Sequence, residues 1–224
     1  GVGNDVSQLN APVGFAVDAS GNIYIADTGN HRVVHWAPGA TAGVVLAGQG
    51  GQGSANNQLS SPMDVALLSG GSGLYVADTD NNRVVICDLP TNVMCADVAG
   101  SGGQGSANNQ LDGPTSVAYG NGALYIADSA NDRVMKYTGS SSGSVAAGGN
   151  GQGSALNQLD NPTGVSVDEN GALYVSDGGN HRVVKVLDGT TDGEVVAGGT
   201  GQGSSATQLD SPRGLALDSA GALH

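Results

Sequence analysis

The sequence predicts an all-β chain of repeated four-stranded antiparallel sheets, stacked as the blades of a β-propeller. Similar segments begin at Leu9, Leu59, Leu111, Leu159 and Leu209, so the starts lie 50, 52, 48 and 50 residues apart. A period of this size is typical of a propeller blade or a solenoid coil. Short runs rich in Val, Ile and Tyr alternate with Gly, Asn and Asp, which is the signal of strands and turns. No segment shows the period of a helix.

In the first copy the expected strands are residues 14–18, 22–27, 32–36 and 43–48, which read GFAVD, NIYIAD, RVVHW and GVVLAG. The second strand is apolar at nearly every position, and so are its counterparts LYVAD and LYIAD, which indicates burial on both faces. Sheets packed face to face around an axis provide that burial, whereas a lone sheet does not. The turns DASGN, DENGA and DSAGA begin with Asp and carry Gly near the end, which favours a tight turn over a calcium loop.

We therefore expect residues 1–224 to form a single domain with complete blades near 9–58, 59–110, 111–158 and 159–208 and a partial fifth at 209–224. The last copy stops within its second strand, and the opening GVGNDVSQL is similar to the end of a blade-to-blade connection. Such a set of blades leaves an open ring with unpaired edges. The expectation is a domain incomplete at both ends, whose missing blades come from the rest of a longer chain or from another chain.

The charge balance argues against two classes of partner. The chain has 20 Asp and Glu against 7 Lys and Arg, a net charge of −13. This surface repels phosphate backbones and anionic lipid, and the few arginines are not clustered. No apolar run approaches the roughly 18–20 residues that a membrane helix needs. We expect no nucleic-acid binding and no membrane insertion.

The two cysteines, Cys87 and Cys95, lie in VVICDLPTNVMCADV, where two strand-like runs flank Leu-Pro-Thr-Asn. Two interpretations stay open at this point. A hairpin would bring the sulfurs together as a disulfide, which implies an oxidising compartment. Alternatively, both are small buried thiols, which are common in protein cores.

A motif of the form G-N-I-Y-[IV]-A-D-T-x-N-x-R-V occurs at residues 21–33, 73–84, 122–134 and 171–183. It resembles the NHL repeat, a family whose fold is a β-propeller, usually of six blades. The resemblance implies a ring that would need roughly 300 residues at this period. It does not fix a function, because the family includes RNA-binding regulators, receptor ectodomains and a peptide-amidating lyase.

Three polar residues of this motif persist in every copy. Chemistry takes place at one site, so a feature of every blade is expected to serve the fold. We expect the Asp to accept backbone N–H bonds in the turn between the second and third strands, and the Asn to adopt a left-handed conformation. The Arg would pair with an Asp of its own or the neighbouring blade, ideally through two bonds. We call these the staple residues: Asp27, Asn30, Arg32, Asp78, Asn81, Arg83, Asp128, Asn131, Arg133, Asp177, Asn180 and Arg182.

Candidate binding residues are found where the copies differ. The position after the shared proline reads Val13, Met63, Thr115, Thr163 and Arg213, and the next reads Gly14, Asp64, Ser116, Gly164 and Gly214. Two of these are charges expected near the mouth of the central channel, where they could contact a polar ligand. The candidates are Asp64, Arg213 and Ser116, together with His31 and His181 from the variable position of the motif.

The long connections between blades, such as GQGGQGSANNQL, should share a face with the motif turns, because turns alternate between the two ends of an up-and-down sheet. They lack the Lys-Ser/Thr of a phosphate-binding loop, so we expect flexible surface crossings. Lyase members of the resembled family hold zinc with histidines near the axis. Here His31, His35, His181 and His224 all lie outside the expected inner strands, so we predict no catalytic residue, metal or cofactor.

Together these inferences favour a non-catalytic interaction module, extracellular or on a cell surface, that binds a protein or glycan through the loop-rich face. The alternative is a structural repeat subunit of an extracellular filament or coat, docked through its open blade edges. An enzyme, either a lyase or a hydrolase, ranks third.

Overall fold

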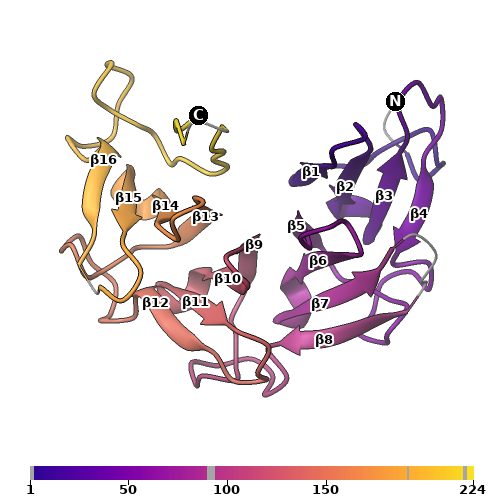
Figure 1. The fold of residues 1–224 in the computed structure, drawn as a ribbon, viewed down its shortest axis with the longest axis horizontal. Helices are drawn as coiled ribbons and strands as arrows, with labels where there is room; N and C mark the ends of the chain where they lie inside the picture. The colour runs from indigo at the N-terminus through magenta and orange to yellow at the C-terminus, as the bar shows by residue number, and fades with distance from the viewer. Residues whose placement is uncertain (1–2, 90–93, 191, 219–220) are drawn as a thin grey trace.

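The protein consists of four antiparallel four-stranded sheets arranged around a common centre as an open arc (Figure 1). The computed structural model describes residues 3–89, 94–190, 192–218 and 221–224. In each sheet the strands follow one another in chain order, and each sheet lies within one of the predicted fifty-residue units. We refer to the sheets as blades one to four.

Blade one contains β1 (Phe15–Val17), β2 (Ile23–Asp27), β3 (Arg32–Trp36) and β4 (Val44–Ala47). Blade two contains β5 (Pro62–Leu67), β6 (Gly73–Asp78), β7 (Arg83–Asp88) and β8 (Cys95–Ala99). Blade three contains β9 (Pro114–Gly120), β10 (Ala123–Asp128), β11 (Arg133–Tyr137) and β12 (Ser144–Gly148). Blade four contains β13 (Pro162–Val167), β14 (Leu173–Asp177), β15 (Arg182–Val186) and β16 (Glu194–Gly198).

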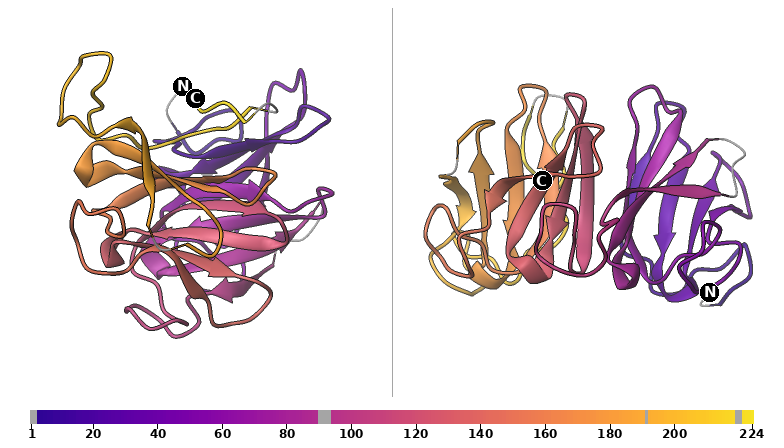
Figure 2. Two further views of the ribbon diagram at one scale, coloured as in Figure 1. Left: turned by 60° about the vertical axis from the view of Figure 1, so that its left-hand side comes forward. Right: turned by 90° about the horizontal axis from the view of Figure 1, so that it is seen from below.

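The first strand of each blade lies at the inner side of the arc and the fourth at its periphery (Figure 1). Seen from the side, the blades stand next to one another with their strands running from one end of the arc to the other (Figure 2). The core lies between blades. One cluster joins blades one and two, and includes Ala26, Val33, Val76 and Val85, while two equivalent clusters join the later pairs. Burial of the second strand on both faces follows from this stacking in blades two to four. In β2 of blade one the expected burial is incomplete, because Ile23 is 38% exposed.

A short 3-10 helix, which the sequence analysis did not predict, opens the turn between the second and third strands. These helices are η1 (Thr28–Asn30), η2 (Thr79–Asn81), η3 (Ser129–Asn131) and η4 (Gly178–Asn180). The prediction that the staple Asn is left-handed was wrong. The Asn is the last residue of the 3-10 helix, and the residue after it adopts the left-handed conformation. The left-handed residues have φ of 52–54° and are His31, Asn82, Asp132 and His181.

A disulfide joins Cys87 to Cys95, which are paired directly across β7 and β8. This confirms the first of the two interpretations of the cysteines. Of the expected Leu-Pro-Thr-Asn turn, residues 90–92 lie outside the described part of the chain.

Beyond blade four, Leu209 forms a bridge to Gln202, and Leu217 pairs with Leu223 in an antiparallel bridge. The described part of 209–224 therefore begins a further hairpin on the inner side of the arc. Within the described ranges, no helix has both the length and the hydropathy needed to span a bilayer.

Candidate functional site

The staple residues make the same contacts in all four blades. In blade three, Oδ2 of Asp128 accepts hydrogen bonds from Nε of Arg133 at 2.7 Å and from Nδ2 of Asn131 at 2.8 Å. Its Oδ1 accepts from the backbone N–H of Asp112 at 2.6 Å. This donor belongs to the segment leading into the first strand, not to the motif turn, so the partner expected for the Asp was wrong. The carboxylate instead joins the turn to the start of its own blade.

The Arg pairs with the Asp of its own blade through Nε alone, so the expected pair of parallel hydrogen bonds to the carboxylate is not formed. Its remaining nitrogens bind the connection that precedes the blade. In blade three they donate to the backbone carbonyls of Ser106, Ala107 and Gln110. The connections and the motif turns therefore share one face, as predicted. They are hydrogen-bonded along their length and are not the loose crossings that we expected.

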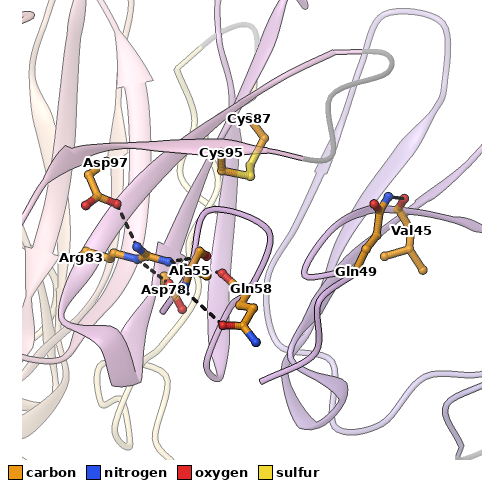
Figure 3. Close-up of a disulfide and its surroundings, with 9 residues drawn as sticks. All are labelled: Val45, Gln49, Ala55, Gln58, Asp78, Arg83, Cys87, Cys95 and Asp97. Carbon is orange, nitrogen blue, oxygen red and sulfur yellow. Dashed lines mark hydrogen bonds and ion pairs between the residues drawn. A yellow bond between two sulfur atoms is a disulfide. The ribbon is translucent and has the colours of Figure 1, made fainter. Parts of the chain in front are cut away.

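Figure 3 shows this arrangement in blade two, where Arg83 lies between two carboxylates. Nε of Arg83 is 2.8 Å from Oδ2 of Asp78, and Nη1 is 3.0 Å from Oδ1 of Asp97. Asp78 is fully buried, whereas the side chain of Asp97 is 45% exposed. Burial raises the pKa of Asp78, while the N–H of Ser60 and the side chains of Asn81 and Arg83 act in the opposite direction. A buried carboxylate with such a set of donors serves the fold.

A second set of contacts joins each blade to the next, and we call it the seam. The residue before the shared proline donates its backbone N–H to the left-handed residue of the preceding blade. The four hydrogen bonds are 2.8–3.0 Å long and join Ser61 to His31, Gly113 to Asn82, Asn161 to Asp132 and Ser211 to His181. The proline carbonyl accepts a hydroxyl from the preceding blade: Pro62 from Thr28, Pro114 from Thr79, Pro162 from Ser129 and Pro212 from Thr163.

The seam accounts for two of the candidate binding residues, His31 and His181. Nδ1 of His31 accepts the N–H of Ser61 at 3.0 Å, and Nδ1 of His181 accepts the N–H of Ser211 at 3.0 Å. Asn82 and Asp132 make the same contact through side-chain oxygens. The residue type varies at this position, but a side-chain hydrogen-bond acceptor is present in all four copies.

The other candidates lie together at the centre of the arc. A cavity of about 370 Å³ is lined by the starts of the inner strands, including Met63, Asp64, Thr115, Ser116 and Arg213. A further hollow of about 560 Å³ continues along the same strands and shares Asp64 and Ser116 with the first. His224, which sequence reasoning placed away from the axis, also lines this second hollow. We call the two together the axial cavity; its mouth opens on the face that carries the long connections.

Asp64 is held by the neighbouring blade. Its Oδ2 accepts from Oγ of Ser116 at 2.7 Å and from the N–H of Val117 at 3.0 Å, while Oγ of Ser116 accepts from the N–H of Val165 at 3.2 Å. Protein atoms surround the carboxyl although part of the residue faces the cavity, and this burial raises the pKa of Asp64 to about 6. Asp64 and Ser116 thus link the inner strands of blades two, three and four.

Glycine occupies the position of Asp64 where two inner strands approach closely. A Cβ on Gly14 would lie 2.7 Å from the carbonyl oxygen of Met63, and one on Gly164 would lie 2.0 Å from that of Arg213. The residue type at this position therefore depends on how closely the neighbouring inner strand approaches.

Arg213 differs from the other candidates. Its side chain lines the mouth of the axial cavity and is exposed, and within the described part of the chain its guanidinium forms no hydrogen bond or ion pair. An exposed guanidinium without a protein partner remains able to bind a carboxylate through two parallel bonds. In the described ranges no three side chains of His, Cys, Asp or Glu converge to hold a metal ion.

Residues 9–36 and 159–186, which reach from the leading Leu to the end of the third strand in blades one and four, match the NHL repeat. These two segments are NHL repeats. Two curated proteins are similar to parts of the chain. A 94-residue stretch is 36% identical to Protein SUPPRESSOR OF QUENCHING 1, chloroplastic, of Arabidopsis thaliana, and covers 40% of this chain and 9% of that protein. A 92-residue stretch is 30% identical to NHL repeat-containing protein 2 of Bos taurus, and covers 38% of this chain and 13% of that protein.

The matched region thus spans about a tenth of each curated relative. Among solved structures, this chain is similar to a chain of the nidogen/laminin complex, with a TM-score of 0.68 and 17% identity over 91% of this chain and 67% of that one. It is also similar to streptogramin B lyase, with a TM-score of 0.65 and 13% identity over 98% of this chain and 62% of that one. At these identities the likeness shows the fold alone: four antiparallel sheets arranged as in propellers.

Proposed function

We propose that this NHL-repeat protein is a non-catalytic interaction module that binds a protein or glycan partner through its loop-rich face. The observation that carries the proposal is the exposed guanidinium of Arg213 at the mouth of the axial cavity. The staple arginines, by contrast, are engaged by carboxylates and carbonyls and are at most 8% exposed. Arg213 is therefore the group of this face best suited to bind a partner.

The surroundings of Arg213 favour a partner that presents one carboxylate and not a polyanion. The net charge of −13 repels a dense array of negative charges at long range. At short range, a single carboxylate can pair with the guanidinium while the rest of the partner packs on Met63 and Val13 at the cavity rim. An acidic side chain on a protein loop and a uronic acid of a glycan both meet this description.

The test is binding of the purified protein to a displayed peptide library and to a glycan array, each containing acidic and neutral members. We expect acidic ligands to bind, and Arg213→Ala to abolish the signal. The matched control is Lys185→Ala, which removes a cation that lies over the ring of Tyr174 on blade four. Equal binding by both variants, or no binding by the unaltered protein, would contradict the proposal.

The disulfide between Cys87 and Cys95 supports an extracellular or cell-surface location, because such bonds persist in oxidising compartments. We further propose that a six-bladed ring is completed by additional blades from a longer chain or from a second chain. An enzymatic function, either lyase or hydrolase, ranks below the binding role, since the axial candidates Asp64 and Ser116 are engaged with each other.

A second candidate function is that of a structural subunit in an extracellular filament or coat. It is favoured by β1, the inner strand of blade one, where Phe15, which also lines the axial cavity, is 66% exposed and Val17 is 52% exposed. Exposed apolar residues next to an open blade are suited to docking. Concentration-dependent assembly, followed by light scattering and reduced by Phe15→Lys, is the expected result for this role. A monodisperse monomer at high concentration would exclude it.

A further inference from the structure

A separate hollow, which shares no lining residue with the axial cavity, lies between blades two and three. It has a volume of about 350 Å³ and is lined by Tyr75, Asp97, Tyr119, Tyr137 and the segment 138–141. That segment connects β11 to β12, so it lies at the end of the blade opposite to η3 and the long connections. We call this hollow the tyrosine cleft.

Three of its side chains depart from the repeat. Asp97 pairs across the sheet with Val85, and the corresponding residues of the other blades are Val45, Val145 and Val195. Tyr119 pairs with Leu124, and its counterparts are the aliphatic residues Val17, Leu67 and Val167. Tyr137 has the counterparts Trp36, Cys87 and Val186. A valine or leucine satisfies the fold at the first two positions, so packing alone requires neither the carboxylate of Asp97 nor the phenol of Tyr119, although the Tyr119 ring also packs against the core.

The departures place an aromatic surface next to hydrogen-bonding groups. The rings of Tyr75 and Tyr119 belong to different blades, and their centroids are 5.4 Å apart with an angle of 31° between the planes. Asp97 forms an ion pair with Arg83, yet its side chain is 45% exposed and keeps acceptor capacity. The segment 138–141 adds the hydroxyls of Thr138, Ser140 and Ser141. Aromatic faces with a polar edge bind ligands that are apolar on one side and polar on the other.

We propose that the tyrosine cleft is a binding site for a neutral pyranose. The C–H face of the sugar packs against Tyr75 and Tyr119, while its hydroxyls bond to the carboxylate of Asp97 and to the hydroxyls of segment 138–141. The volume is at the small end of the range of about 300–1,000 Å³ found for ligand sites, which suits a single sugar ring. The carboxylate of Asp97 and the acidic surface disfavour sugars that carry a negative charge.

This inference does not depend on the proposed role of Arg213, because the two sites lie on different faces and share no lining residue. The test uses methyl glycosides of glucose, galactose, mannose and N-acetylglucosamine as probes. Binding to the purified protein is measured by saturation-transfer NMR, with the affinity obtained by titration. We expect saturable binding of at least one of these pyranosides.

The variants restore residues that the other blades already carry, so the fold should tolerate them. Tyr119→Leu and Asp97→Val are each expected to weaken binding at least tenfold, whereas Arg213→Ala leaves it unchanged. Circular dichroism and thermal unfolding check that both variants remain folded. The proposal is overturned if none of the four pyranosides binds, or if folded Tyr119→Leu binds as well as the unaltered protein. Loss of binding on Arg213→Ala alone would also overturn it, since it would assign the sugar to the axial cavity.

Discussion

The backbone N–H of Ser61 donates a 3.0 Å hydrogen bond to Nδ1 of His31, and this bond joins blade two to blade one. The imidazole therefore has the same role at this seam as the amide of Asn82 and the carboxylate of Asp132 at the next two. What the position requires is an acceptor on a residue that adopts a left-handed conformation, and His, Asn and Asp meet both conditions better than most residues.

We expect His31→Asn to change the free energy of unfolding by less than about 0.5 kcal/mol, because Asn keeps the acceptor. His31→Ala should lower it by roughly 1–2 kcal/mol, because the N–H of Ser61 is left without its partner. Urea unfolding of the two variants measures the difference. Equal loss in both would show that the ring, and not the hydrogen bond, stabilises the seam.

The staple predicts a large penalty for replacing its arginine. An ammonium group cannot bind Asp128 and the carbonyls of Ser106, Ala107 and Gln110 at once, so Arg133→Lys should lower the free energy of unfolding by about 2–4 kcal/mol. Lys136→Met, on the same strand, is the control. It breaks the ion pair with exposed Asp188 and should cost no more than about 1 kcal/mol. A similar loss in both variants would disprove the role assigned to the staple.

Asp64 should make the stability depend on pH. Its folded pKa of about 6 lies above the value near 3.9 expected when unfolded, so the folded protein holds the proton more tightly. Stability from this group is fully present below pH 4 and is lost as the pH rises through 6. The expected loss is on the order of 2 kcal/mol, allowing for the part of the residue open to solvent.

The variant Asp64→Ser carries the residue found at the equivalent position of blade three and lacks the carboxyl. Chemical denaturation of both proteins at a series of pH values between 4 and 8 measures the effect. The gap between the two curves should change across pH 4–6 and stay constant above pH 7. Parallel curves throughout would mean that Asp64 titrates in its ordinary range.

The disulfide should stabilise blade two. It closes a short loop, since Cys87 and Cys95 are 8 residues apart, and the chain-entropy estimate for such a loop is about 2–3 kcal/mol. Reduction, or replacement of both cysteines by Ala, should lower the unfolding free energy by that amount. If a reductant has no effect on the unaltered protein but the double variant is destabilised, the loss comes from packing of the sulfurs and not from the bond.

Much of the fold could be predicted because its signals recur. The third strand of blade one was expected at residues 32–36 and is found at Arg32–Trp36, and the second strand is one residue shorter than expected. The staple was recognisable because Asp27, Asn30 and Arg32 return in every copy. Their partners were harder to predict, since the carbonyls bound by Arg32 belong to residues 4, 5 and 8, some 24–28 positions earlier.

The seam was missed because its key position varies in the sequence. The residues at this position share a side-chain acceptor and a left-handed backbone conformation but not one residue type; they are His31, Asn82, Asp132 and His181. The tyrosine cleft was missed for a different reason. Tyr75 and Asp97 come from one blade and Tyr119 from the next, and only the stacking of blades brings these side chains together.

The seam also gives the arc a direction. In the first three blades the 3-10 turn offers an acceptor and a hydroxyl, and the proline segment of the following unit offers the matching N–H and carbonyl; in blade four the hydroxyl comes from Thr163 instead. Copies can thus be added only head to tail, and a unit duplicated in tandem would arrive with both halves of the contact already encoded. Such a chain can lengthen by gene duplication without needing a new type of contact between units.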